Sequence, residues 1–160
     1  MFYLSVSYIC TYIQMRLVEQ AHWCIAGKSR RLLRDYGYWY VPDGRNASQQ
    51  FEFERVEVKP QALEWLFSTA CGIQFKVSAD NLNNDMGISP SFKKAIAAQA
   101  RAYCEHGLSK LSSNSLNGRA IKWIMTLACH YHRIPSNSAH SQDIVKNKVL
   151  DTAIYTQEAL

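Results

Sequence analysis

The spacing of apolar residues changes along the first 80 residues of this 160-residue chain, and this change constrains the fold more than any other feature. Between Met15 and Tyr36 the apolar side chains recur at the spacing of an amphipathic helix. Three later segments have the aromatic and β-branched composition of strands: 36–41, 51–59 and 73–77. Pro60 and Gly72 suit the two ends of a helix. The predicted order in this region is therefore helix, strand, strand, helix, strand.

Helical patterns fill the second half of the chain, at 91–106, 117–132 and 141–158. We therefore expect an α/β (α+β) fold, in which a small mixed sheet flanked by helices is followed by an α-helical C-terminal extension. The expected division is an N-terminal segment of uncertain structure, an α/β core and a helical extension: 1–15, 16–89 and 90–160. The first of these is the longest uncharged stretch, and it is shorter than the roughly 20 residues that span a bilayer.

Composition limits the class of protein. Apolar residues make up 48% of the chain and charged residues 19%, which argues against a disordered protein or a coiled coil. The five cysteines have no paired spacing, which indicates reduced thiols and a cytoplasmic protein rather than a disulfide framework. The net charge of +5 permits a polyanionic partner such as DNA without requiring one.

The sharpest candidate site combines Asp43 with the run Glu57-Val58-Lys59. In a strand, Glu57 and Lys59 share one face, and a hairpin would bring Asp43 beside Glu57. Two neighbouring carboxylates favour a hard divalent cation such as Mg²⁺, which can activate water for phosphodiester hydrolysis. Lys59 would then orient or deprotonate the water, or neutralise the developing charge. The alternative is a solvated strand face that carries a surface Glu–Lys pair.

These residues resemble the PD-(D/E)xK nuclease superfamily, and within it the TnsA-like endonuclease subunits of certain transposons. The resemblance covers about residues 16–82 and rests on three segments: Tyr40-Val-Pro-Asp43, Val56-Glu-Val-Lys-Pro60 and Gly72-Ile-Gln-Phe-Lys-Val77. It implies a restriction-endonuclease-like core that cleaves DNA with Mg²⁺ or Mn²⁺. It also implies a transposase or another mobile-element subunit as a partner.

The resemblance also implies roles for single residues. Asp43 and Glu57 would be metal ligands, the Val58 carbonyl a third ligand, and Lys59 the catalytic lysine. Some members of the superfamily add a glutamate from the first helix, which in this chain would be Glu19.

Other residues admit two interpretations each. A basic cluster near the end of the first helix could hold DNA phosphates or be a solvated helix end; its members are Lys28, Arg30, Arg31 and Arg34. A zinc site would draw on His22, Cys24, Cys129, His130 and His132, but the chain has no Cys-x₂-Cys pair, which favours core thiols. A helix-turn-helix is conceivable around 102–121.

The leading functional prediction is a metal-dependent DNA endonuclease of transposon, phage or mobile-element type. The alternative is a non-catalytic nucleic-acid-binding regulator of phage or plasmid origin. A third hypothesis is a helical interaction module whose charge is incidental.

Overall fold

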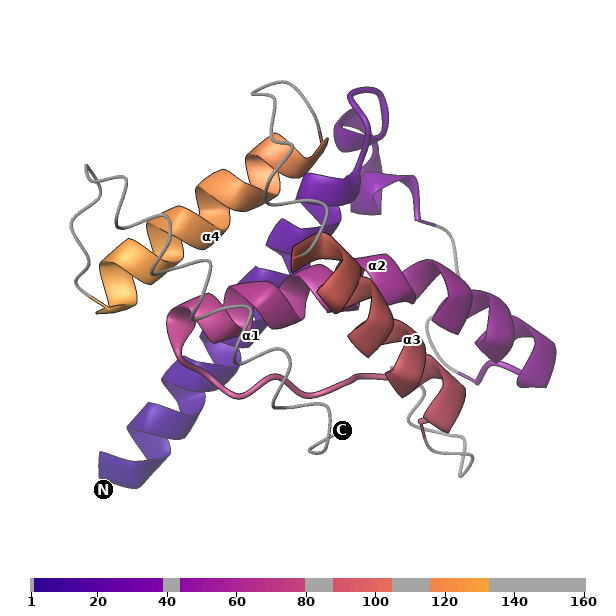
Figure 1. Ribbon diagram of the computed structural model, residues 1–160. Helices are drawn as coiled ribbons and strands as arrows, with labels where there is room; N and C mark the ends of the chain where they lie inside the picture. Colours follow the sequence, from indigo (N-terminus) through magenta and orange to yellow (C-terminus); the bar gives the residue numbers. More distant parts are fainter. Residues whose placement is uncertain (1, 39–43, 80–87, 105–115, 133–160) are drawn as a thin grey trace.

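The computed structural model describes residues 2–38, 44–79, 88–104 and 116–132 (Figure 1). These residues form four α-helices and two short 3₁₀ helices: α1 (Phe2–Ile25), η1 (Arg30–Leu32), η2 (Arg34–Gly37), α2 (Ala47–Cys71), α3 (Pro90–Ala102) and α4 (Leu116–His132). No residue in the described ranges lies in a β-strand. The expected α/β fold with a mixed sheet is therefore wrong.

Helix α2 is the centre of the structure. It packs against α1, α3 and α4, and α1 also contacts α4. Figure 1 shows α2 running across the middle of the molecule. Every residue from Pro60 to Ser68 is buried, as expected for a helix that is covered on all sides by its neighbours.

Helix α2 begins well before Pro60 and includes the segment 51–59, for which the sequence predicts a strand. Its start is a capping box: the Asn46 side chain accepts the Gln49 N–H at 2.9 Å, and the Gln49 side chain accepts the Asn46 N–H at 3.0 Å. Gly72 ends the helix in the left-handed conformation, with φ 71°, as the sequence predicts.

The inward face of the first half of α2 explains the wrong strand prediction. Buried residues recur there at helical spacing, but of the three, Gln50, Phe53 and Glu57, only Phe53 is apolar. A hydrophobic period of 3.6 residues is therefore hidden. Phe51 and Val56, which are 65% and 38% exposed, instead give the segment the aromatic and β-branched composition of a strand.

The other two predicted strands also differ from the structure. Residues 34–37 form η2, and residues 39–43 lie outside the described part. The segment 73–79 has no regular secondary structure. Gln61 holds this segment against α2, because its Nε2 donates to the Ser78 carbonyl at 2.7 Å and its Oε1 accepts the Ser78 N–H at 3.1 Å.

The helices of the second half agree better with the sequence. α3 and α4 confirm helices at about 91–106 and 117–132, whereas 141–158 lies outside the described residues. α1 begins at Phe2 rather than at Met15 and ends at Ile25, two residues before Gly27. The division of the chain at 15/16 and 89/90 stays a prediction. Among the described residues, no helix is long and apolar enough to cross a membrane.

Candidate active site between α1 and α2

A buried ion pair joins α1 to α2. His22 Nε2 lies 3.6 Å from Glu57 Oε2, and the two side chains are only 12% and 6% exposed. The second carboxylate oxygen, Glu57 Oε1, is buried and has no hydrogen-bond partner among the described residues. A buried carboxylate oxygen without a partner is costly, so this atom marks a place where a cation or a donor would be stabilised.

Tyr38 forms one wall of this site. Its ring meets the His22 ring edge to face, with 4.8 Å between centroids and an interplanar angle of 88°. The Arg30 guanidinium lies 4.2 Å from the centre of the same ring. Burial raises the pKa of Tyr38, and Glu57 adds to the rise while Arg30 opposes it. Tyr38 is therefore a neutral phenol beside the ion pair.

Tyr103, at the C-terminal end of α3, is a second phenol near Tyr38. Burial raises the pKa of Tyr103 to about 12, and the nearby Tyr38 contributes to the rise. α1, α2, the end of α3 and the segment after η2 thus supply the residues of the site. It combines the glutamate and histidine side chains with two phenols whose pKa values are raised by burial.

A strained turn directly before Tyr38 places its ring in this position. Asp35 and Tyr36 have φ values of 47° and 55°, and Gly37 follows at 67°. Left-handed conformations at non-glycine residues cost of order 1–3 kcal/mol each and concentrate at functional sites. Arg30 Nε donates to the Tyr36 carbonyl at 2.9 Å and so stabilises the turn.

Of the predicted nuclease residues, Glu57, Val58 and Lys59 lie on helix α2 rather than on a strand. Asp43 lies outside the described residues. Glu57 and Lys59 are on a helix, where residues two apart point in different directions, and Lys59 is exposed. The Val58 carbonyl lies inside α2, where carbonyls accept helical hydrogen bonds and are not available to a metal. Glu19 is exposed and accepts a hydrogen bond from the Tyr36 hydroxyl.

The basic cluster surrounds the turn that follows α1. Arg30 stacks on Tyr38, as described above, and Arg31 lies 5.4 Å from the centre of the Trp23 ring. Lys28 and Arg34 are exposed, and Arg34 Nε lies 3.6 Å from Asp35 Oδ2.

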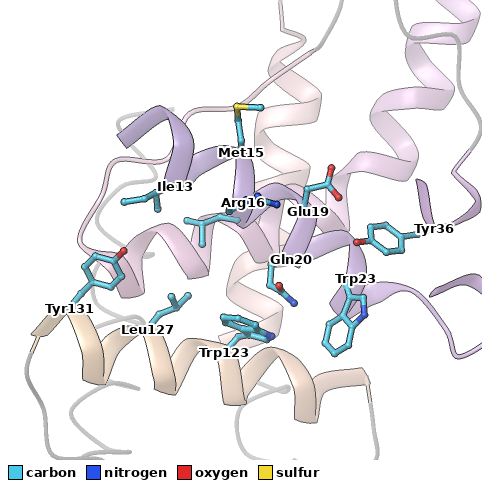
Figure 2. A pocket seen from close by; sticks show the side chains of 11 residues that line it. Ile13, Met15, Arg16, Glu19, Gln20, Trp23, Tyr36, Trp123, Leu127 and Tyr131 are labelled. Atoms are coloured by element: carbon cyan, nitrogen blue, oxygen red, sulfur yellow. The ribbon is translucent and has the colours of Figure 1, made fainter. Parts of the chain in front are cut away.

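A separate groove lies on another face of α1, between α1 and α4. It has a volume of about 990 Å³, and its walls are mainly aromatic and aliphatic, with Arg16 and Glu19 as the charged residues. Figure 2 shows Trp23 and Trp123 close together at one part of the groove and Tyr131 at another. His22 and Glu57 are not among its lining residues, so the ion pair and the groove are distinct features.

His22 and Tyr38 are residues of the site that sequence reasoning missed in this role. The sequence gives His22 only a weak zinc interpretation, and it places Tyr38 in a strand. His22 and Glu57 are 35 positions apart on two separate helices, so no local motif connects them. The described residues contain no group of three or more His, Cys, Asp or Glu side chains that could hold a metal, which leaves the zinc interpretation without support there.

Comparison with known proteins shows a family and a similar curated protein. The family model described as "EpmC: Elongation factor P hydroxylase" matches residues 2–142. The chain is also 49% identical over 108 residues to the elongation factor P lysine hydroxylase of Haemophilus influenzae, an overlap of 68% of this chain and 61% of that protein. The chain thus spans about three fifths of the length of this curated relative. No solved structure matches.

These matches overturn the nuclease interpretation. The matching family and the relative are both described as hydroxylases of elongation factor P, and neither is described as a nuclease or a DNA-binding protein. The predictions of a PD-(D/E)xK or TnsA-like endonuclease, of a nucleic-acid-binding regulator, and of DNA or a transposase as partner are therefore wrong.

Proposed function

We propose that this chain, which belongs to the EpmC family of elongation factor P hydroxylases, hydroxylates a lysine side chain of elongation factor P. The observation that carries the proposal is the buried His22–Glu57 pair with its unpartnered carboxylate oxygen. Both residues lie inside the matched region, and Tyr38 and Tyr103 line the same site. A protein that acts on a translation factor is expected in the cytoplasm.

Hydroxylation replaces a C–H bond of the lysine side chain by C–OH. With dioxygen as the oxidant, one oxygen atom enters the product, and the other leaves as water after taking electrons and protons from a reductant. Enzymes that insert oxygen into unactivated C–H bonds commonly use iron held by two histidines and one carboxylate. When bound, such a metal supplies the means to activate dioxygen.

His22 and Glu57 fit such a metal as two of its ligands, one imidazole and one carboxylate, and the free Glu57 Oε1 supports this fit. The described residues do not complete the set, since no group of three candidate ligands occurs among them. On α1 a second ligand on the same face would come from the position four residues before His22, which Val18 occupies.

The other residues of the site shape and protect it. α1 and α2 bury the ion pair and exclude bulk water from it. The Tyr38 ring covers the His22 imidazole, which fixes the orientation of that ring. Burial keeps the Tyr38 and Tyr103 phenols neutral, so they add no charge to the site.

A mass measurement tests the proposal. Purified chain is incubated with elongation factor P, iron(II), dioxygen and a reductant, and the substrate is examined by intact mass spectrometry. We expect the gain of one oxygen atom on elongation factor P with the unaltered chain and loss of this gain with His22→Ala.

The matched control is His130→Ala, because His130 is an exposed histidine on α4. This variant should keep the activity of the unaltered chain. Equal oxygen incorporation by the His22 and His130 variants would contradict the proposed site, and no incorporation by the unaltered chain would contradict the proposed function.

A further inference from the structure

The segment between α1 and Tyr38 exposes apolar and positively charged side chains together. Leu32 is 87% exposed and Leu33 57% exposed, although leucine is a residue type that is usually buried. Four cations lie within the same seven residues: Lys28, Arg30, Arg31 and Arg34. We call residues 28–34 the basic turn. Two adjacent exposed leucines surrounded by cations are unusual on a surface that contacts only water.

Two of the four cations are held in place before any partner binds. Arg30 stacks on Tyr38 at 4.2 Å and donates from Nε to the Tyr36 carbonyl, and Arg31 stacks on Trp23 at 5.4 Å. A guanidinium stacked on an aromatic ring still presents its N–H edge to a carboxylate. Because these side chains are already ordered, binding costs less rotamer entropy than it would with mobile lysines.

Arg119 adds a third stacked guanidinium from α4. It lies 5.3 Å from the centre of the Trp23 ring and donates to the Cys24 and Ala26 carbonyls at 2.7 and 3.0 Å. The Nε atoms of Arg31 and Arg119 are buried and have no hydrogen-bond partner among the described residues. The Arg31 and Arg119 guanidinium groups are thus both held against the Trp23 ring.

The basic turn is also connected to the buried ion pair. The left-handed residues Asp35, Tyr36 and Gly37 follow it directly and fix its direction. The next residue, Tyr38, contacts His22. A partner that binds the basic turn is therefore held next to the candidate active site.

We propose that the basic turn is the docking surface for an acidic, partly apolar patch on the protein substrate. This inference rests on the proposed function, because that function requires a protein as substrate. Four cations against the carboxylates of Asp35 and Glu19 favour an acidic partner. Leu32 and Leu33 favour a folded protein over a nucleic acid, since a phosphate backbone gains little from exposed leucines.

The test measures the dissociation constant of the full chain for purified elongation factor P by calorimetry. The first variant combines Lys28→Glu with Arg34→Glu, and its matched control combines Lys94→Glu with Lys122→Glu, which are exposed on α3 and α4 and change the net charge equally. We expect the first variant to bind about tenfold more weakly or worse, and the control to change binding by less than about threefold.

A second pair tests the apolar part. Leu32→Ser should also weaken binding, whereas Phe51→Ser, at a side chain that is 65% exposed on α2, should not. Circular dichroism shows whether each variant stays folded. Equal losses for variant and control in either pair would overturn the docking surface. The docking surface would also be overturned if a variant of the basic turn lost binding to a DNA duplex at physiological salt but bound elongation factor P as the unaltered chain does.

Failure of the docking surface and failure of the proposed function give different results. If the unaltered chain and the Lys28/Arg34 variant bind elongation factor P equally, the docking surface is wrong while the hydroxylation assay still decides the function. If the unaltered chain does not bind elongation factor P, the docking surface is overturned, and the hydroxylation assay decides the function separately.

Discussion

Glu57 is a residue that the sequence singles out but that the structure places in a different setting from the predicted one. The sequence marks it as a metal ligand on a strand, in line with Asp43 and Lys59. The structure places it on the buried face of α2, opposite His22. Its chemistry, a carboxylate suited to a cation, could be predicted from the residue type. Its partner could not, because only the packing of α1 against α2 brings His22 to it.

Tyr103 gives a prediction about pH. Its folded-state pKa of about 12 lies above the ordinary value of 10.0, so the folded protein holds this proton more tightly than the unfolded chain. Its contribution to stability is therefore complete below about pH 10 and is lost as the pH rises through about 12.

Urea denaturation at several pH values checks this expectation. Tyr103→Phe should show a smaller fall in unfolding free energy over the same pH range than the unaltered chain. Tyr131→Phe is the control, since Tyr131 is 42% exposed. An identical fall for both variants and the unaltered chain would contradict the account of Tyr103.

Val18 gives a prediction about metal binding. A histidine at this position would lie one helical turn before His22, on the same face of α1, and would add an imidazole to the His22–Glu57 pair. We expect Val18→His to bind Co²⁺ at least about tenfold more tightly than the unaltered chain, as judged by visible absorption. Ala98→His, at an exposed position of α3 with no histidine or carboxylate three or four residues away, is the control, and an equal gain for both variants would contradict the geometry.

At the scale of elements, the sequence contains two competing signals for the start of α2. Asn46 and Gln49 have the spacing of a capping box, which marks the true start of the helix. Pro60 favours a later start, because proline is common at the first position of helices. Gly72 gives an unambiguous end, and this end could be predicted correctly.

The cap of α2 can be tested directly. Asn46→Ala removes the side-chain acceptor of the Gln49 N–H and should lower the unfolding free energy by about 1 kcal/mol. Ser48→Ala, at an exposed position in the first turn of the same helix, should have a smaller effect. Denaturant titration measures both, and equal effects would show that the capping box does not stabilise α2.

The strained turn gives another pair of variants. Gly37 has φ 67°, and an added Cβ would lie 2.9 Å from Leu33 Cδ1, so Gly37→Ala should destabilise the protein by about 1–2 kcal/mol. Gly27→Ala meets no atom within 4 Å and requires no left-handed backbone, so it should be neutral or stabilising. Thermal unfolding of both variants decides this, and a stabilising Gly37→Ala would contradict the described turn.

At the scale of the whole molecule, the sequence predicts the later helices well and the first half poorly. α3 and α4 have apolar residues at clear helical spacing, and both could be predicted. The interior of the first half also contains buried polar residues, among them Arg45, Gln50 and Gln61, which a hydrophobic pattern cannot reveal. Their interactions, such as the contact of Gln61 with Ser78, are visible only in the folded chain.

The central position of α2 predicts where the protein is most sensitive. Phe67 is completely buried in the core, so Phe67→Ala should cost about 3–5 kcal/mol of unfolding free energy. Phe51→Ala, on the exposed side of the same helix, should cost much less. Similar costs in denaturant titration would contradict the placement of α2 at the centre.

The most direct test of the central claim is to locate the oxygen atom that the chain adds. Elongation factor P, treated with the unaltered chain, with Glu57→Gln or with Glu52→Gln, is digested and sequenced by tandem mass spectrometry. Glu52 is the matched control because it is exposed on the same helix as Glu57 and pairs with Arg55. The account predicts a hydroxylated lysine with the unaltered chain and with Glu52→Gln, and an unmodified lysine with Glu57→Gln. Full hydroxylation by Glu57→Gln would contradict it.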